Sequence, residues 1–361
     1  MKKLFDEKQI LNLIISTLDV AKVEPLFGKD DISLISFDKV SKNISNKDNY
    51  LAITCDMLVE HTDVPPKMTF KQVARKALVS CISDLCTKGI KPTIALISLG
   101  IPRYLTKYNI NDIIKGFSVT STEFGFFIVG GDINQSKELI IDCNMLGFSS
   151  NHLNVPRRNG ATPGDYVIVS GPFGYSSSGL TILLNNLKSP NSFFKKKSID
   201  SVLNPSPPFM FGLKLSQYLS SSIDSSDGLA ISLYEIAKES KVNLLIYEDK
   251  IPVPAELKKF SEMNNLNFED LIFYGGEEYN VVGTIARKNL YKINNLAKRY
   301  GLNLFVIGKV TDGIGKVFID LPNERRMLLK NKVLPIYLDK VFKCDGTKNF
   351  ILNVTRRNYP V

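Results

Sequence analysis

The chain has 361 residues, of which 44% are hydrophobic and 23% charged, a composition typical of a globular protein with about two domains. Its formal net charge of +10 favours anionic partners such as nucleotides or phosphorylated metabolites. With only two histidines, a histidine-based zinc site and a Ser-His-Asp triad are both poorly supported.

Neither a membrane nor a nucleic acid is expected as a partner. No apolar run reaches the roughly 18 residues that a membrane span requires, and acidic residues within the first ten argue against a signal peptide, so residues 1–14 are expected to form a surface helix. The densest basic run, Lys195 to Lys197, has no wider basic stripe around it and is expected in a solvated loop. Five cysteines without a CxxC pair suggest reduced thiols and a cytoplasmic protein.

The first half of the chain shows one strong helix between strands. Residues 50–60 alternate well enough to form a strand and contain Asp56 near its end. Apolar residues then recur at helical spacing over residues 69–89, with Thr69 as N-cap, and Asp84 falls at the edge of the apolar stripe, which predicts a half-buried carboxylate. A strand over residues 93–102 and a helix over 109–123 follow.

The segment FFIVGGDINQS, residues 126–136, is an apolar run broken by two glycines and an aspartate. Residues 126–129 have the composition of a strand, and the glycines remove every side chain that would keep another group from the backbone. Asp132 is therefore expected at an open strand end, although an isolated motif of this kind is more often a turn with a solvated aspartate.

A further strand over residues 138–150 and a polar connection over 151–164 lead into the second half. We expect an N-terminal ATP- and Mg²⁺-binding domain over residues 1–154 and a C-terminal α/β domain over residues 155–361. Strands are predicted at 165–171, 242–248, 277–286 and 302–310, and helices at 180–187, from about 229 to 238, and at 288–300. The overall fold class is therefore mixed α/β, or α+β, with two domains.

Several acidic residues share one setting, the polar end of an apolar strand or the rim of an apolar helix: Asp30, Asp31, Asp56, Asp84, Asp132, Asp224 and Asp227. Taken singly, each is more often a turn residue or a helix cap. Together they would repel one another unless cations neutralise them, and Mg²⁺ with a nucleoside triphosphate fits a set rich in carboxylates and poor in histidine. Gly130 with Gly131, and the GPFGYSSSG turn at 171–179, could supply backbone amides for phosphate.

The order and spacing of seven short motifs resemble those of the thiamine-monophosphate kinases, in the superfamily of aminoimidazole ribonucleotide synthetase and selenophosphate synthetase. The motifs are GKDD at 28–31, TCD at 54–56, ISDL at 82–85, GGD at 130–132, RNGATPGD at 158–165, IDSSDGL at 223–229 and GGEEY at 275–279. The chain lacks the P-loop and protein-kinase signatures. The resemblance covers residues 26–311.

This resemblance implies an aminoimidazole ribonucleotide synthetase-like fold, in which the N-terminal domains of a homodimer share a β-barrel. It implies a site in the cleft between the domains, where ATP phosphorylates thiamine monophosphate by in-line transfer assisted by several Mg²⁺ ions. No covalent or general-base residue is expected, and Asp132 and Arg158 would matter most for transfer. The implied Mg²⁺ positions are Asp31, Thr54, Cys55, Asp56, Asp84, Asp132, Asp224 and Asp227. The implied ATP positions are Gly131, Asp132, Arg158 and Ser226, and the implied substrate positions are Glu277 and Tyr337.

Four positions depart from the usual family pattern: Lys29, Cys55, Tyr175 and Ser232. Cysteine is a soft ligand and a poor one for Mg²⁺, so at Cys55 a backbone carbonyl would have to serve. Two alternatives therefore stay open: an ATP-dependent enzyme of the same superfamily with another acceptor, and a non-catalytic nucleotide-binding relative.

Overall fold

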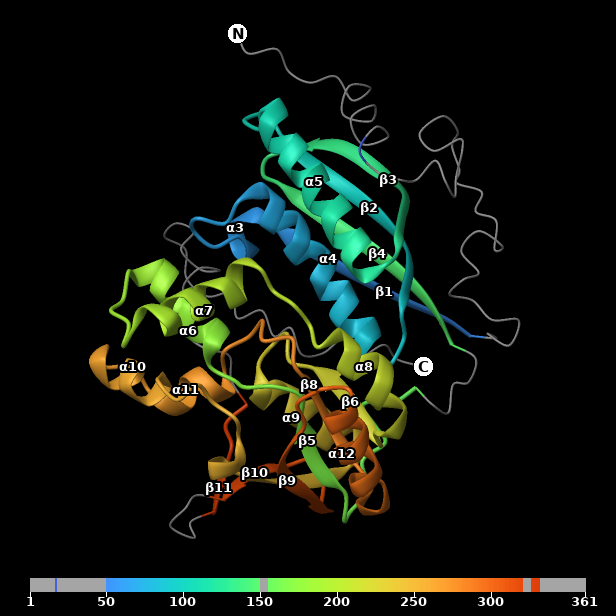
Figure 1. Ribbon diagram of the computed structural model, residues 1–361, viewed down its shortest axis with the longest axis vertical. Helices are drawn as coiled ribbons and strands as arrows, with labels where there is room; N and C mark the ends of the chain where they lie inside the picture. Colours follow the sequence, from blue (N-terminus) through green and yellow to red (C-terminus); the bar gives the residue numbers. More distant parts are fainter. Residues whose placement is uncertain (1–16, 18–49, 150–154, 321–325, 332–361) are drawn as a thin grey trace.

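The computed structural model describes residues 17, 50–149, 155–320 and 326–331. Asp30, Asp31, Tyr337 and the helix expected over residues 1–14 lie outside the described residues. Two β-sheets organise the described chain, each with helices packed on it (Figure 1). Within these ranges, no helix is both long enough and apolar enough to cross a membrane.

The first half forms a four-stranded sheet in the order β1-β4-β2-β3. Its strands are β1 (Tyr50–Val59), β2 (Pro92–Pro102), β3 (Phe127–Ser136) and β4 (Ile140–Ser149), and its helices are α3 (Glu60–Asp63), α4 (Phe70–Thr87) and α5 (Lys107–Phe124). Strands β2 and β3 run parallel, whereas β4 is antiparallel to both β1 and β2.

The expected N-cap of the strongest helix is confirmed. The Thr69 side chain accepts a hydrogen bond from the backbone N–H of Gln72, while the Gln72 side chain accepts from the backbone N–H of Thr69. This reciprocal capping box satisfies two backbone donors at the start of α4. Thr106 and Asn109 cap α5 in the same way, so both long helices begin at residues whose side chains define the first turn.

Among the described elements, helices cover one face of the four-stranded sheet and leave the other face exposed. On the inner face, alternate residues such as Leu58, Ile97 and Cys143 are buried in a core with α4 and α5. The ladder registers place Asp56, Cys143, Ile97 and Gly131 in one row on this face. The next row, on the outer face, contains Met57, Asp142, Ser98 and Asp132, because neighbouring residues of a strand point to opposite faces.

The expectation that the strand ends before the two glycines is wrong. Strand β3 continues through them to Ser136, so Asp132 lies within an edge strand. Gly131 permits this because a Cβ atom there would lie only 1.7 Å from the carbonyl oxygen of Ile97 on β2. The glycine therefore serves the close approach of two strands, one of the uses of glycine inside a sheet.

The second half forms a seven-stranded sheet in the order β11-β10-β7-β9-β5-β8-β6. Its strands are β5 (Tyr166–Val169), β6 (Ser221–Asp224), β7 (Val242–Tyr247), β8 (Val281–Ile285), β9 (Phe305–Asp312), β10 (Val317–Asp320) and β11 (Arg326–Leu328). The α-helices are α6 (Tyr175–Asn185), α7 (Ser192–Leu203), α8 (Phe209–Leu215), α9 (Leu229–Ser240), α10 (Leu257–Met263), α11 (Phe268–Phe273) and α12 (Leu290–Arg299). Among the described strands, β7 and β10 pair in parallel and the other ladders of this sheet are antiparallel, while an isolated parallel bridge joins Arg157 to Ser221 of β6.

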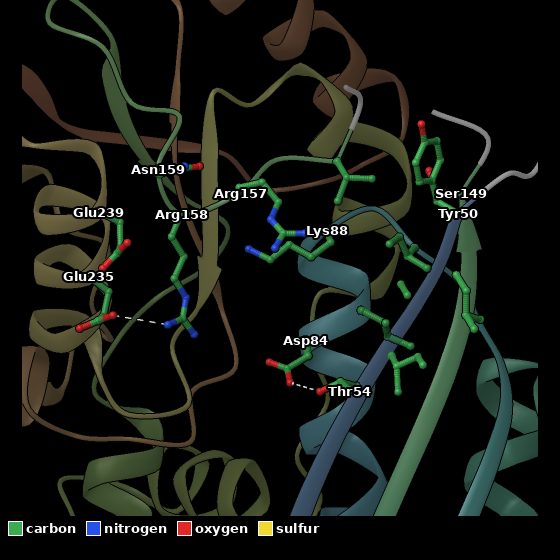
Figure 2. A pocket seen from close by; sticks show the side chains of 16 residues that line it. Tyr50, Thr54, Asp84, Lys88, Ser149, Arg157, Arg158, Asn159, Glu235 and Glu239 are labelled. Atoms are coloured by element: carbon green, nitrogen blue, oxygen red, sulfur yellow. Dashed lines mark hydrogen bonds and ion pairs between the residues drawn. The ribbon is translucent and has the colours of Figure 1, made fainter. Parts of the chain in front are cut away.

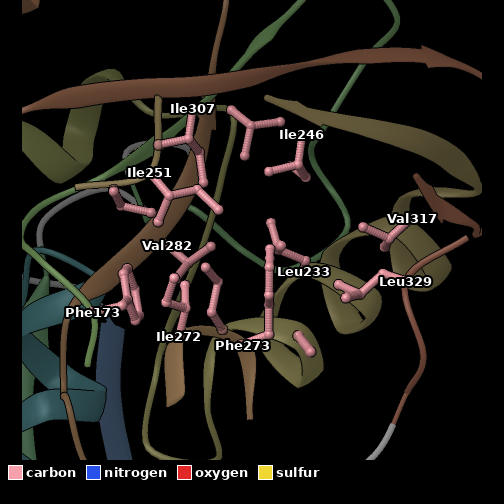
Figure 3. Packing of buried hydrophobic residues seen from close by; sticks show 14 of the residues in the cluster. Phe173, Leu233, Ile246, Ile251, Ile272, Phe273, Val282, Ile307, Val317 and Leu329 are labelled. Carbon is pink, nitrogen blue, oxygen red and sulfur yellow. The ribbon is translucent and has the colours of Figure 1, made fainter. Parts of the chain in front are cut away.

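Helices cover this second sheet on both faces. Val167 and Val169 of β5 belong to a core shared with α9 and α11, whereas Ile168 between them packs with α8 and α12. The larger of the two cores is filled by aromatic and branched side chains such as Phe173, Phe273 and Ile307 (Figure 3). A sheet buried on both faces explains why its strands read as almost continuous apolar runs.

Two expectations about loops are corrected. Lys195 to Lys197 lie in α7, because the Asn191 side chain caps this helix by accepting from the N–H of Phe194. Helix α6 starts at Tyr175, within the turn expected at 171–179, and therefore earlier than the predicted residue 180. In α7 the local cap outweighs the abundance of lysine that suggested a loop, whereas the N-cap residue of α6, Gly174, makes no side-chain hydrogen bond.

Candidate functional site

A cavity of about 960 Å³ lies between the two halves of the chain (Figure 2). Its walls come from β1, from the last turns of α4, from the segment that leads into β5, and from α9. The polar and charged residues among its lining are Thr54, Asp84, Lys88, Ser149, Arg157, Arg158, Asn159, Glu235 and Glu239. Acidic and basic side chains thus share one cleft, with Asp84 and Thr54 on one side and the arginines facing them.

Four of the predicted acidic positions lie close enough to influence one another electrostatically, and one of them, Asp84, lines this cleft. Asp56 lies on the inner face of β1, Asp84 in α4, Asp224 at the end of β6 and Asp227 just before α9. Burial raises the pKa of Asp56 to about 7 and that of Asp224 to about 6, and the nearby Asp84 carboxylate adds to both shifts. Burial also raises the pKa of Asp227, an effect that the Arg158 guanidinium opposes. The shifts follow from desolvated carboxylates that repel one another.

Hydroxyl groups hold two of these carboxylates in place. Thr54 Oγ1 donates to Asp84 Oδ2 at 2.6 Å and so joins β1 to α4. Ser83 Oγ donates to Asp224 Oδ2 at 2.8 Å, and Ser226 Oγ donates to Asp224 Oδ1 at 3.2 Å. The structure therefore places Thr54 beside Asp84 and Ser226 beside Asp224.

Helix α4 presents a second, polar stripe to the other half of the chain. Lys76, Ser80, Ser83 and Asp84 recur at helical spacing, and the first three contact Glu277, Tyr279 and Asp224 respectively. The sequence analysis considered only the apolar stripe and missed Lys76, Ser80 and Ser83. Their signal was present as polar residues three or four positions apart, a spacing that places them on one face of the helix.

The donor atoms at the acidic end suit Mg²⁺, which prefers oxygen ligands and retains several waters. In the described ranges, however, no three His, Cys, Asp or Glu side chains converge closely enough to hold one ion. One or two carboxylates at a time are thus available to each ion, and phosphate oxygens and water would have to complete the shell. This is the usual arrangement for Mg²⁺ at phosphate-transfer sites.

Two predicted positions point away from this cluster. Cys55 and Asp132 are exposed on the outer face of the sheet, and Cys55 Sγ donates to Asp142 Oδ1 at 3.3 Å. Partial desolvation and Asp142 raise the pKa of Cys55 to about 11, so it stays a neutral thiol. Asp132 also lies three strands away from β1, roughly 14 Å at ordinary strand spacing. Within one chain, the structure does not bring Asp132 to the other carboxylates.

Glu277 forms an ion pair between the two halves. Its Oε1 lies 2.5 Å from Lys76 Nζ of α4, which also donates to the backbone carbonyl of Asp63. The Glu277 backbone has a positive φ of 63°, and its N–H donates to the carbonyl of Ser226 at 2.7 Å. This strained residue is held against the loop that carries Asp227, so a predicted substrate position adjoins the acidic end of the cleft.

Backbone amides of the glycine- and serine-rich turn at 171–179 already bind a carboxylate of the same chain. Glu278 Oε1 accepts from the backbone N–H groups of Gly174 at 2.7 Å and Ser176 at 3.0 Å, at the start of α6. A carboxylate at a helix N-terminus satisfies free donors and complements the helix dipole. The expectation that this turn cradles phosphate is therefore wrong for these amides, because Glu278 takes them.

Without bound metal, stability should fall as pH rises through the acidic cluster. Because the pKa of Asp56 and that of Asp224 exceed their ordinary values, the folded protein takes up protons from about pH 7 downward, before the unfolded chain does. We expect a larger free energy of unfolding by urea at pH 5.5 than at pH 8 in the presence of a chelator. Asp56→Asn should reduce this difference, whereas the exposed-site variant Asp312→Asn should not. An identical pH dependence in wild type and Asp56→Asn would contradict the placement of Asp56.

Comparisons with known proteins agree along most of the chain. Residues 29–149 match the family model for the N-terminal domain of AIR synthase related proteins, and residues 162–320 match its C-terminal domain. A thiamine-monophosphate kinase of Nitrosopumilus maritimus is 40% identical over 75% of this chain and 84% of its own length. One from Pyrococcus horikoshii is 35% identical over 74% of this chain and 81% of its own.

Solved structures show the same fold. The thiamine-monophosphate kinase of Stenotrophomonas maltophilia superposes with a TM-score of 0.74 at 23% identity, over 88% of this chain and 98% of its own. The structure of AaThiL complexed with AMPPCP and TMP superposes with a TM-score of 0.66 at 29% identity, over 79% of this chain and 92% of that one. The hydrogenase maturation protein HypE, in complex with ATP, is 17% identical with a TM-score of 0.71, a likeness of fold alone.

Proposed function

The chain belongs to the thiamine-monophosphate kinase family of AIR synthase related proteins, and on that basis we propose that it transfers a phosphoryl group from ATP to thiamine monophosphate, giving ADP and thiamine diphosphate. The relatives named above support this activity, as does the AaThiL complex with an ATP analogue and TMP. The observation that carries the proposal is a set of four carboxylates that influence one another electrostatically, one of which, Asp84, lines the same cleft as Arg158.

The proposed chemistry requires positioning and charge neutralisation more than covalent help from the protein. Asp56, Asp84, Asp224 and Asp227 would hold Mg²⁺ together with phosphate oxygens, with Asp31 as a further proposed ligand. Bound Mg²⁺ would neutralise the charge that builds up on the phosphate oxygens during in-line transfer. Among the chain's own groups, Thr54 and Ser83 keep the carboxylates oriented, and Arg158 offers a cationic fork for phosphate.

Arg158 would have to exchange partners for this role. Its Nη1 lies 3.4 Å from Glu235 Oε2, and the Arg158 side chain is 52% exposed, so the pair is weak and open to the cleft. A phosphate group competes well for such an arginine because bidentate, charge-assisted hydrogen bonds are stronger. Ser226 and the backbone of Gly131 remain proposed ATP contacts, and Glu277 and Tyr337 proposed substrate contacts.

We also propose that the enzyme is a homodimer in which the four-stranded sheets face each other as a shared barrel. Support comes from the outer face of the sheet, where Leu51, Ile53, Met57 and Leu96 are exposed. Exposed apolar side chains clustered on one sheet face are typical of a protein interface. In such a dimer Asp132, on the same outer face, would reach the cleft of the partner subunit.

Mixed dimers test this arrangement. Asp84→Asn and Asp132→Asn should each be inactive alone, because each removes a carboxylate from both sites. If Asp132 acts across the interface, a mixed dimer of the two variants retains one intact site, and random mixing restores about a quarter of wild-type activity. We would measure activity after the variants are unfolded together and refolded, with separately refolded variants as controls. No recovery would contradict the transfer of Asp132 between subunits.

The remaining proposals concern domain limits and location. We propose a boundary near residue 154, between an N-terminal domain over residues 1–154 and a C-terminal domain over residues 155–361. The two sheets support it, since each is built from strands of only one half. Cys55, Cys81, Cys86 and Cys143 are free thiols, which supports a reducing, cytoplasmic location.

The direct test of function is incubation of the purified protein with ATP, Mg²⁺ and thiamine monophosphate, followed by chromatography for thiamine diphosphate and ADP. Both products should form in equal amounts. Consumption of ATP only with another phosphorylated acceptor would replace thiamine monophosphate while leaving the family assignment intact. Nucleotide binding without turnover would favour the non-catalytic alternative.

A further inference from the structure

Three cationic side chains gather at the basic end of the cleft. Lys88, Arg157 and Arg158 all line the cavity, and Figure 2 shows the side chains of Lys88 and Arg157 extending toward one another. Only Arg158 belongs to the positions that the family resemblance implied. The proposed phosphoryl transfer assigns no role to the charges of Lys88 and Arg157.

Hydrogen bonds to one buried residue hold Lys88 and Arg157 at this place. The backbone N–H of Ser222, on β6, donates to the carbonyl of Arg157 at 3.0 Å, and Lys88 Nζ donates to the carbonyl of Ser222. Ser222 Oγ in turn donates to the carbonyl of Thr87, the residue before Lys88. Ser222 is fully buried. Its hydrogen bonds therefore fix both the C-terminal end of α4 and the segment before β5 against strand β6.

This arrangement places three like charges close together, and of the three only Arg158 has a carboxylate partner among the described residues, Glu235. Burial, followed by the charge of Arg158 and, more weakly, that of Arg157, lowers the pKa of Lys88 to about 8, although Asp224 and Asp84 act in the opposite direction. In the described part of the chain, no carboxylate forms an ion pair with Lys88 or Arg157. Cations kept together by backbone contacts, at the edge of a cavity, provide a ready site for a multiply charged anion.

We propose that Lys88 and Arg157, with Arg158 beside them, form a phosphate-binding subsite at the basic end of the cleft. Lys88 follows Asp84 by four residues, one helical turn, so the subsite and the acidic end lie about 6 Å apart along α4. One phosphorylated ligand is then held by cationic donors at one end and by carboxylate-bound metal at the other. The position of the subsite is inferred from the structure alone. The proposal rests on the proposed function only in naming the ligand that supplies the phosphate, which is either the nucleotide or the acceptor.

Inorganic phosphate is the first probe, because its binding does not depend on turnover. By calorimetry at pH 7, Lys88→Met and Arg157→Gln should each weaken phosphate binding by about tenfold or more, the usual effect of losing a charge-assisted hydrogen bond. Arg157→Lys should retain most of the affinity. Lys298→Met and Arg103→Gln, which remove exposed charges outside the cleft, should bind phosphate as the wild type does.

Separate titrations with AMPPCP and with thiamine monophosphate identify the source. The ligand whose dissociation constant rises in both Lys88→Met and Arg157→Gln is the one whose phosphate occupies the subsite. Far-UV circular dichroism and urea unfolding check that the variants are folded. Should Lys88→Met fail to fold, Arg157→Gln carries the test, because the Arg157 side chain is exposed.

Unchanged binding of phosphate, AMPPCP and thiamine monophosphate in folded Arg157→Gln would overturn the subsite. A wild-type protein that makes no thiamine diphosphate, yet binds phosphate through Lys88 and Arg157, would refute the proposed function and leave the subsite standing. The two proposals therefore fail in distinguishable ways.

Discussion

Asp84→Asn is expected to lower the rate of thiamine diphosphate formation by about 10²- to 10³-fold, the range found when one preorganised electrostatic group is removed from a transfer site. Asp84 lies in the cleft, and its charge affects the pKa of Asp56, Asp224 and Asp227, so it is the carboxylate shared by the whole cluster. The amide keeps the size of the side chain and can still pair with Thr54, but it loses the charge that attracts Mg²⁺.

Stability separates this effect from misfolding. In the absence of metal, Asp84→Asn should unfold at the same or a higher urea concentration than the wild type, because it relieves repulsion among carboxylates. Addition of Mg²⁺ with AMPPCP should stabilise the wild type more than the variant. Asp312→Asn, at the exposed end of β9, serves as the matched control and should keep full activity. An active Asp84→Asn enzyme would remove Asp84 from the site.

Lys76→Met is expected to reduce the free energy of unfolding by about 3 kcal/mol, because it leaves the carboxylate of Glu277 without its partner. The side chains of Lys76 and Glu277 are only 6% and 20% exposed, and their atoms lie 2.5 Å apart. The lower end of the range for buried pairs applies, since Glu277 retains some contact with water. Urea unfolding at pH 7 measures the effect.

A double-mutant cycle identifies the cause. Glu277→Gln combined with Lys76→Met should recover part of the lost stability, because the double variant contains no unpaired buried charge. Lys298→Met, which removes an exposed lysine from α12, should change stability by less than about 0.5 kcal/mol. Additive losses in the double variant would mean that Lys76 and Glu277 act independently. The pair joins α4 to the loop before β8, so its loss should also loosen the cleft between the two halves.

Helix α4 shows which structural features can be predicted from local sequence patterns. Its apolar periodicity and the capping residue Thr69 predicted both its start and its half-buried Asp84, because these features depend on side chains within three or four positions of one another. Strand β1 could equally be predicted from the sequence, since the alternation of its apolar and polar residues is a local pattern. The same reasoning failed for β3, where the glycines accommodate the carbonyl of Ile97 from another strand.

The candidate site was predicted in part. Asp56, Asp84, Asp224 and Asp227 lie within electrostatic reach of one another, whereas Asp132 and Cys55 lie on the other face of the sheet. That difference depends on strand parity and register, which motif spacing does not encode. Lys76, Ser83, Lys88 and Arg157 were missed because each acquires its role from a partner 65 or more positions away.

The sequence by itself therefore determined the family and the mixed α/β class and supplied the acidic residues as candidates, since these depend on composition, local periodicity and ordered motifs. Only the tertiary structure decided which carboxylates lie near one another. It also decided that Glu278 accepts hydrogen bonds from the amides at the start of α6, and that Lys88 and Arg157 both hydrogen-bond to Ser222. The physical reason is that electrostatic and hydrogen-bond energies depend on distance in space, and side chains far apart in the chain become neighbours only when the two sheets pack together.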